Sequence, residues 1–235
     1  MQLLHHPAGS RGHFDHGWLQ TWHSFSFGDY HDPERMGFGT LRVLNDDIVQ
    51  PGQGFGLHPH RDMEIVTLML AGTLQHRDSL GHGSKLEAGE VQVMSAGSGI
   101  RHSEANASAS EELRLLQIWV LPRSKGGEPR YAQGRPPALE PGRFTNWVGP
   151  DDSGLPLWIH QDAWFSVAEL APGQEIAYTL VNAAHGVYFF LISGGAAVAG
   201  VNLAPHDALA VAGAPKVPVV AREKSRLLAI EVPAN

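Results

Sequence analysis

Residues 54–70 have the sequence Gly54-Phe-Gly-Leu-His-Pro-His-Arg-Asp-Met-Glu-Ile-Val-Thr-Leu-Met-Leu70, in which a histidine-containing segment precedes a short apolar run. Similar runs of β-branched and aliphatic residues recur along the chain, separated by Gly, Asp, Asn and Pro. Short strands at this spacing are typical of antiparallel sandwiches and barrels. No segment has the period of about 3.6 residues that a long amphipathic helix requires, so we predict an all-β fold. The predicted strands are Thr40–Leu44, Ile65–Leu70, Val91–Met94, Leu113–Leu121, Trp158–Ile159, Trp164–Leu170, Ile176–Val181, Val187–Ile192, Ala208–Val211 and Leu227–Val232.

The chain changes character between Pro122 and Pro156, where prolines interrupt a polar stretch that also contains glycine. Both residue types favour turns and loops over regular structure. Strand-like runs stand on both sides of this stretch, and the later ones are richer in Ala, Gly and Val. We therefore predict two β modules in tandem, residues 1–122 and 158–235, joined by a linker or covering loop over residues 123–157.

The composition is that of a folded protein with a sizeable core, because 43% of the 235 residues are hydrophobic and 17% are charged. Lys and Arg number 17 against 24 Asp and Glu, which gives a formal charge of −7. This balance disfavours direct nucleic-acid binding, since affinity for phosphates comes mostly from clustered positive charge. The chain has no cysteine, so any metal must bind through nitrogen and oxygen.

Neither targeting nor membrane insertion is predicted. The amino end has no basic segment followed by a long apolar run, as a secretory signal would. The most apolar stretch, Val187–Ala204, is broken by glycines and suits two strands around a turn better than a bilayer span. We expect a cytoplasmic protein with no membrane partner.

Two pairs of candidate ligands stand two residues apart, His58 with His60 and His102 with Glu104. That spacing places both side chains of a pair on one face of a strand. If hairpins bring the pairs together, three imidazoles and one carboxylate meet at one point. Such donors suit iron, nickel, copper or zinc, and open coordination positions admit a substrate or dioxygen. A single His-x-His pair fits ordinary polar strand residues equally well, and the second pair is what favours a metal site.

These residues resemble the two motifs of the cupin superfamily. The first motif is matched with one residue more than usual before Gly72, and the second has Gly97 in place of the usual proline. The usual upstream glycine spacing of the second motif is not kept. The matching residues are Gly52, His58, His60, Glu64 and Gly72 in the first motif and Gly99, His102 and Asn106 in the second.

Within that superfamily the chain resembles the pirin family, whose members show the same departures. The resemblance covers most of the first 106 residues, and the carboxyl half is similar only in length and strand pattern. The runs that carry it are Phe25-Ser-Phe-Gly-Asp-Tyr30, Gly39-Thr-Leu-Arg-Val-Leu-Asn-Asp46, Gly54-Phe-Gly-Leu-His-Pro-His-Arg61, His76-Arg-Asp-Ser-Leu-Gly81 and Ala96-Gly-Ser-Gly-Ile-Arg-His-Ser-Glu104.

The resemblance implies a bicupin of two jelly-roll barrels, of which only the first holds a metal. The implied ligands are His58, His60, His102 and Glu104. Iron(II) is the implied metal, and nickel, copper, manganese, cobalt and zinc also fit. The implied reaction opens the heterocyclic ring of a flavonol such as quercetin with dioxygen and releases carbon monoxide. Glu104 is the implied catalytic base that accepts the hydroxyl proton.

Two assignments stay open at this point. Glu64 either orients a ligand imidazole or pairs with Arg61 or another strand neighbour. The phenylalanines at positions 25, 27, 38 and 55 are candidate walls for a flat aromatic ligand, and we expect at least two of them to be plain core.

Three functions compete. Besides the dioxygenase, the chain can be a metal-binding redox or stress-responsive regulator that acts through a protein partner, since eukaryotic pirins are transcription cofactors. A cupin isomerase of phosphorylated sugars ranks last, because no cluster of Lys and Arg stands near the motifs. For the dioxygenase we expect a monomer with no direct nucleic-acid partner.

Overall fold

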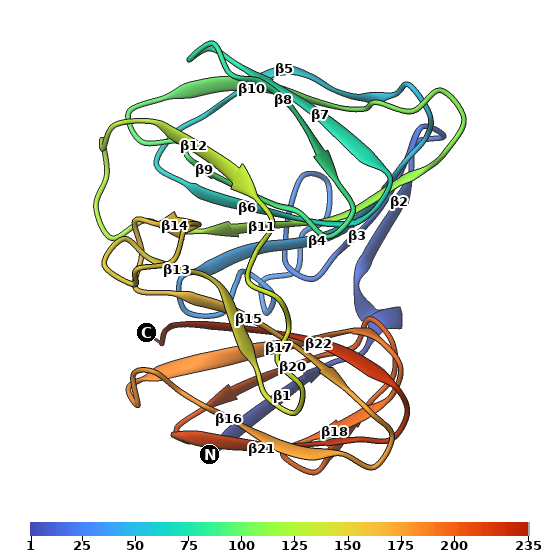
Figure 1. The fold of residues 1–235 in the computed structure, drawn as a ribbon, viewed down its shortest axis with the longest axis vertical. Coiled ribbons are helices and arrows are strands. Elements are labelled where there is room, and N and C mark those ends of the chain that lie inside the picture. The colour runs from blue at the N-terminus through green and yellow to red at the C-terminus, as the bar shows by residue number, and fades with distance from the viewer. Residues whose placement is uncertain (235) are drawn as a thin grey trace.

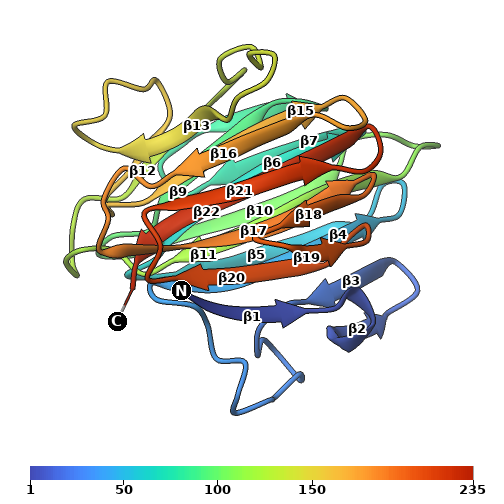
Figure 2. The same cartoon turned by 90° about the horizontal axis from the view of Figure 1, so that it is seen from below.

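The computed structural model describes residues 1–234, whose regular structure consists of β-strands and one short 3-10 helix, η1 (Ala8–Ser10). Four sheets stack in layers along the long axis of the molecule (Figure 1). The strands of successive layers run in similar directions (Figure 2), as in other aligned sheet packings. The predicted all-β architecture of two tandem barrels is confirmed.

The N-terminal barrel consists of a seven-stranded sheet, ordered β12-β9-β6-β11-β4-β3-β2, that faces a four-stranded sheet, ordered β5-β10-β7-β8. Every pairing in these two sheets is antiparallel. The strands are β2 (Gly12–Asp15), β3 (Leu19–His23), β4 (Leu41–Val49), β5 (Gly54–His60), β6 (Glu64–Ala71), β7 (Thr73–Asp78), β8 (Gly83–Glu87), β9 (Val91–Ser95), β10 (Ile100–Asn106), β11 (Leu113–Val120) and β12 (Arg130–Gly134).

The C-terminal barrel repeats this plan, with a seven-stranded sheet ordered β1-β20-β17-β22-β15-β13-β14 and a four-stranded sheet ordered β16-β21-β18-β19. Its one parallel pairing joins β13 to β14. The strands are β1 (Gln2–His6), β13 (Thr145–Pro150), β14 (Trp158–Ile159), β15 (Trp164–Leu170), β16 (Glu175–Thr179), β17 (His185–Ser193), β18 (Ala196–Val198), β19 (Val201–Leu203), β20 (Ala208–Ala212), β21 (Lys216–Ala221) and β22 (Ser225–Pro233).

Alternation along the strands decides which side chains enter a barrel. In β3, Leu19, Thr21 and His23 are buried while Gln20 and Trp22 are partly exposed, which is the two-residue period of a strand. Each of the predicted strands overlaps a strand of the structure. The sequence pattern therefore located the strands, although their ends shift by a few residues.

The two large sheets pack against each other across the middle of the molecule. Leu116 and Ile118 of β11 belong to the same buried apolar cluster as Tyr188 and Phe190 of β17 and Ile230 of β22. All five side chains are inaccessible to solvent. The barrels thus share a core, and burial of apolar surface holds them together.

Three strands cross the sequence limits that we predicted for the modules. From the amino end, β1 pairs with β20 of the C-terminal barrel. Within residues 123–157, β12 pairs with β9 and β13 pairs with β15. Each added strand supplies hydrogen-bond partners to a strand that would otherwise be a sheet edge. The stretch richest in proline therefore contributes one strand to each barrel.

Among residues 1–234 no helix has the length and apolar character needed to cross a bilayer. The cytoplasmic location stays a prediction.

Candidate metal centre

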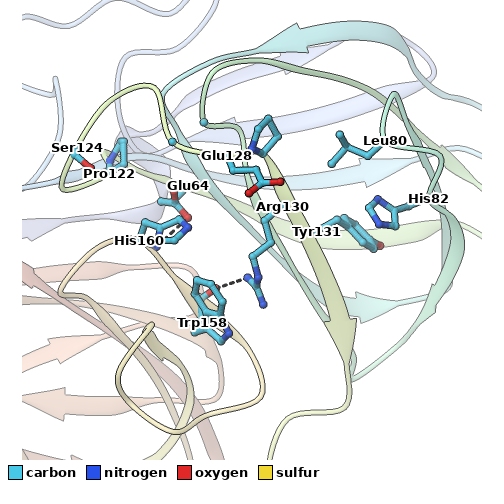
Figure 3. Close-up of a pocket in the computed structure, with 13 residues that line it drawn as sticks. Glu64, Leu80, His82, Pro122, Ser124, Glu128, Arg130, Tyr131, Trp158 and His160 are labelled. Carbon is cyan, nitrogen blue, oxygen red and sulfur yellow. Dashed lines mark hydrogen bonds between the residues drawn. The ribbon is translucent and has the colours of Figure 1, made fainter.

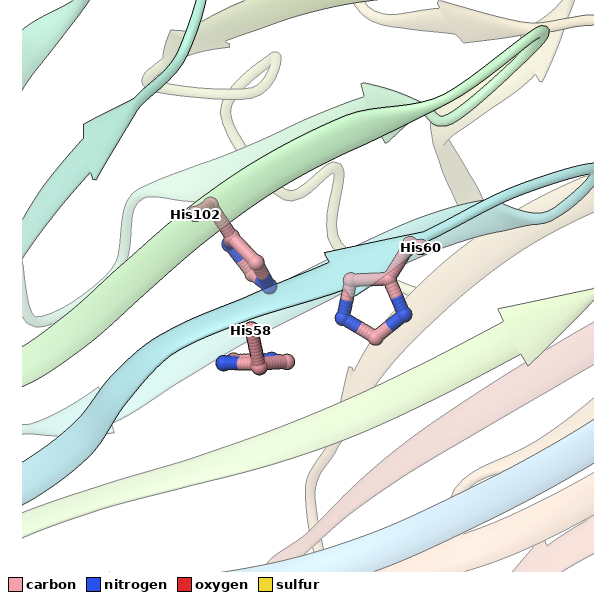
Figure 4. A group of neighbouring side chains, drawn as sticks. All are labelled: His58, His60 and His102. Atoms are coloured by element: carbon pink, nitrogen blue, oxygen red, sulfur yellow. The ribbon is translucent and has the colours of Figure 1, made fainter.

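Three histidines from two neighbouring strands meet inside the N-terminal barrel (Figure 4). His58 and His60 lie on β5, and His102 on β10 is the direct register partner of His58. The ring centroids of His58 and His102 are 4.5 Å apart, and His60 lies 4.8 Å from each of them. One ring nitrogen from each histidine lies within 4.8 Å of the others. The structure thus brings together three of the four predicted ligands.

Burial disfavours the protonated form of these imidazoles, which leaves their ring nitrogens available to a metal ion. Burial, reinforced by neighbouring histidines, lowers the pKa of His102 to about 3 and that of His60 to about 4. Both nitrogens of His102 are buried and have no hydrogen-bond partner within residues 1–234, an arrangement that costs free energy unless a ligand completes it. The ring of His58 contacts the carbonyl oxygen of Gly56 through Nδ1 at 2.7 Å. Donation from Nδ1 to this oxygen leaves Nε2 free to bind a metal.

Glu104, the fourth predicted ligand, stands beside this group. The register of β10 on β5 shifts after His102, so that Glu104 pairs with Phe55, and such a bulge re-aims a side chain. The buried Glu104 carboxylate accepts hydrogen bonds from Gln92 Nε2 at 2.6 Å and from Gln117 Nε2 at 3.0 Å. Each carboxylate oxygen has two lone pairs, so each oxygen can still bind a metal while it accepts its hydrogen bond from a glutamine side chain.

His76 is a candidate that our reading of the sequence missed. It lies on β7, is fully buried, and forms a second group with His102 and Glu104 whose ligand atoms lie within 4.8 Å of one another. Its Nε2 contacts Asp78 Oδ2 at 3.1 Å, while its Nδ1 has no hydrogen-bond partner in the described part of the chain. The available signal was the His-x-Asp spacing, because it places His76 and Asp78 on one face of a strand.

The three histidines and Glu104 line a cavity of about 200 Å³. Phe27 and Phe55 are also among its walls, whereas Phe25 and Phe38 belong to the apolar packing between the barrels. Two of the four phenylalanines are thus core, as expected. Nitrogen and oxygen donors beside an aromatic cavity suit a divalent transition metal and a flat ligand.

A larger cavity of about 570 Å³ lies elsewhere and includes Glu64 (Figure 3). The guanidinium of Arg130 stacks over the ring of Trp158 at 3.5 Å from its centroid. Burial raises the pKa of Glu64, and its carboxylate accepts hydrogen bonds from Ser95 Oγ at 2.6 Å and from the backbone N–H of His160 at 3.2 Å. Ser95 is the register partner of Glu64. Of the two alternatives for Glu64, the structure therefore has the pairing with a strand neighbour.

Comparisons with known proteins agree with the two-barrel fold. The Pirin family profile matches residues 5–120, and the profile of the quercetinase C-terminal cupin domain matches residues 147–232. A curated protein of Escherichia coli K12 named quercetin 2,3-dioxygenase is 42% identical over 96% of both chains. A pirin-like protein of Caulobacter vibrioides is 39% identical over 96% of this chain and 97% of its own. The crystal structure of the bacterial pirin YhhW from Escherichia coli in complex with nickel(II) superposes with a TM-score of 0.93, at 39% identity over the whole of both chains.

Proposed function

Because this chain belongs to the pirin family and has its bicupin fold, we propose that it is a metal-dependent dioxygenase of flavonols such as quercetin. The reaction opens the heterocyclic ring with dioxygen and releases carbon monoxide. The observation that carries the proposal is the group His58, His60 and His102 on the wall of an aromatic cavity. The names of relatives in the family support the substrate class.

The residues that hold the metal are His58, His60, His102 and Glu104. Iron(II) is the proposed metal, and the related structure, which is a complex with nickel(II), supports a divalent transition metal as the cofactor. The bound ion supplies a Lewis acid for the oxygen atoms of the flavonol and an electron path to dioxygen.

Glu104 accepts the hydroxyl proton of the flavonol at a carboxylate oxygen. The amides of Gln92 and Gln117 hold the carboxylate through their N–H groups, so its position is fixed before substrate binds. The faces and edges of Phe27, Phe55 and Trp119 in the cavity wall exclude water and confine a flat ring.

Protein that is purified without oxygen, loaded with iron(II), and mixed with quercetin and air tests this function. We expect loss of flavonol absorbance together with oxygen uptake and carbon monoxide release. The His60→Ala variant should abolish all three, while His13→Ala, on the exposed face of β2, should not. Metal-loaded protein that turns over none of several flavonols would instead favour the regulator that acts through a protein partner.

The ligand assignment has a test of its own, in which two buried glutamates are compared. Glu104→Gln should weaken metal retention more than Glu64→Gln, because Glu64 lies in the other cavity and bonds Ser95. Metal content after dialysis against a chelator measures the difference. Equal metal loss from both variants would contradict the assignment of Glu104 as a ligand.

A further inference from the structure

A row of polar side chains crosses the large sheet of the N-terminal barrel. In the strand register, His23 pairs with Asn45, Asn45 with Gln117, Gln117 with Thr67, and Thr67 with Gln92. Directly paired residues point to the same face of a sheet, and Gln117 and Gln92 both reach Glu104 on the opposite sheet. The row therefore lies on the inner face of the barrel.

One half of this row is satisfied by its neighbours. Gln92 donates to Glu104 at 2.6 Å and to Thr67 Oγ1 at 3.2 Å. Thr67 Oγ1 donates to Gln117 Oε1 at 3.1 Å, and Gln117 Nε2 donates to Glu104 at 3.0 Å. These three side chains are explained by the support that they give to the carboxylate.

The other half of the row is not satisfied. Asn45 is 3% exposed and its Oδ1 has no hydrogen-bond partner among the described residues; His23 is 5% exposed and its Nδ1 has none either. Both residues line the cavity that holds His58, His60 and His102. Buried polar atoms without partners are destabilising, so a polar group that enters the cavity and bonds this pair would be stabilised there.

The position of Asn45 and His23 indicates the shape of a ligand that would bind them. At the usual strand spacing, Asn45 and His23 lie about 5 and 10 Å from Gln117 along the row. A series of ring contacts leads from the histidine cluster to His23 through Trp119 and Phe27. The ring centroids of His60 and Trp119 are 4.8 Å apart. Those of Trp119 and Phe27 are 5.2 Å apart, as are those of Phe27 and His23. A flat ligand that reaches from the metal to this pair is therefore aromatic along its length and polar at its far end.

We propose that Asn45 and His23 bind phenolic hydroxyl groups on the ring of the substrate that lies remote from the metal. The carboxamide oxygen and an imidazole nitrogen can each accept a hydrogen bond, one from each of two neighbouring hydroxyl groups on that ring. The site thereby selects flavonols with a hydroxylated outer ring over flavonols in which that ring is bare. This inference rests on the proposed function, since it assumes that a flavonol occupies the cavity.

The test measures binding rather than turnover. The nickel(II)-loaded protein is titrated without oxygen with quercetin and with galangin, the flavonol that lacks hydroxyl groups on the outer ring. We expect quercetin to bind the unaltered protein roughly tenfold more tightly, the worth of about one buried hydrogen bond. Asn45→Leu and His23→Phe should each lose most of that preference while keeping their affinity for galangin. His23→Gln, which retains a polar group, should recover part of it.

Gln20→Leu is the matched control, because Gln20 lies on β3 between the inward-pointing residues and is partly exposed. It should leave both affinities unchanged. Equal affinity of the unaltered protein for the two flavonols overturns the inference even if the variants fail to fold, and so does an equal loss of both ligands in folded, metal-loaded variants. Selective binding without turnover supports this site and contradicts only the dioxygenase, whereas no binding of either flavonol contradicts both.

Discussion

The two barrels have the same plan of seven strands facing four, yet their interiors differ in kind. The N-terminal barrel has the polar row from His23 to Gln92 across its large sheet. In the C-terminal barrel, the middle of a register row, Ala229, Phe189 and Leu209, is apolar, and all three side chains are inaccessible to solvent within one cluster. The polar residues at one end of this row, Ser166 and Asn146, bond each other. The two barrels therefore have the same backbone arrangement, and the side chains on the inner face determine whether a barrel contains an apolar core or a polar site.

Phe189→Ala is expected to have the largest effect on stability. Removal of a large, fully buried ring leaves a cavity, which typically costs about 3–5 kcal/mol of unfolding free energy. Unfolding of the metal-free protein in guanidinium chloride measures this loss of unfolding free energy. Phe27→Ala is the control, because Phe27 lines an existing cavity and its removal should lower the unfolding free energy clearly less. An equal loss in both variants would mean that the interiors do not differ as described.

The pH dependence of stability should expose the buried carboxyl of Asp47 in the N-terminal barrel. Burial raises its pKa to about 7, although the hydroxyl of Thr21, which donates to it at 2.5 Å, opposes the rise. The folded state then holds a proton that the unfolded state has released, so Asp47 alone lowers stability as pH rises from about 4 to about 7, by up to about 1.4 kcal/mol per pH unit. The lowered pKa values of His60 and His102 act in the opposite direction over this range, because the unfolded state binds the protons that these folded imidazoles release. Asp47→Asn removes the Asp47 contribution, so the unfolding free energy of the metal-free protein in urea should rise more steeply with pH than that of the unaltered protein. A slope unchanged by the substitution would show that Asp47 is ionised in the folded state.

Between the barrels, one buried ion cluster interrupts the apolar contact. The carboxylate of Asp46 lies 3.6 Å from Arg11 Nη1, 3.2 Å from Arg114 Nη2 and 3.0 Å from His206 Nδ1 of the C-terminal barrel. Asp46→Asn leaves the buried Arg11 guanidinium without its counter-charge, which should cost about 3 kcal/mol. Asp151→Asn, in the exposed pair with Arg123, should cost less than about 1 kcal/mol. Similar costs in calorimetry or denaturant unfolding would mean that this inter-barrel cluster contributes no more than a surface pair.

The sequence was sufficient to predict whatever depends on local spacing. Apolar runs predicted the strands, and the two-residue spacing of His58 and His60 correctly placed both side chains on one face of β5. The sequence was not sufficient to predict contacts that depend on the register between strands distant in the chain. Nothing near Asn45 or Gln117 in the sequence indicates that they are neighbours, because their pairing follows from the arrangement of the whole sheet. The bulge after His102, which sets the direction of Glu104, is equally invisible in the spacing.

The smallest expected effect is that of Gln117→Leu on metal affinity. This substitution tests whether the polar row supports metal binding rather than only the stability of the barrel. In Gln117→Leu, the Glu104 carboxylate loses one of its two amide donors and is held less firmly. Loss of such a supporting hydrogen bond typically lowers metal affinity about 10- to 100-fold. Competition with a chelator measures the affinity, and Gln20→Leu on the outward side of β3 should leave it unchanged. An unaltered affinity in folded Gln117→Leu would show that Glu104 either does not bind the metal or is positioned without the row.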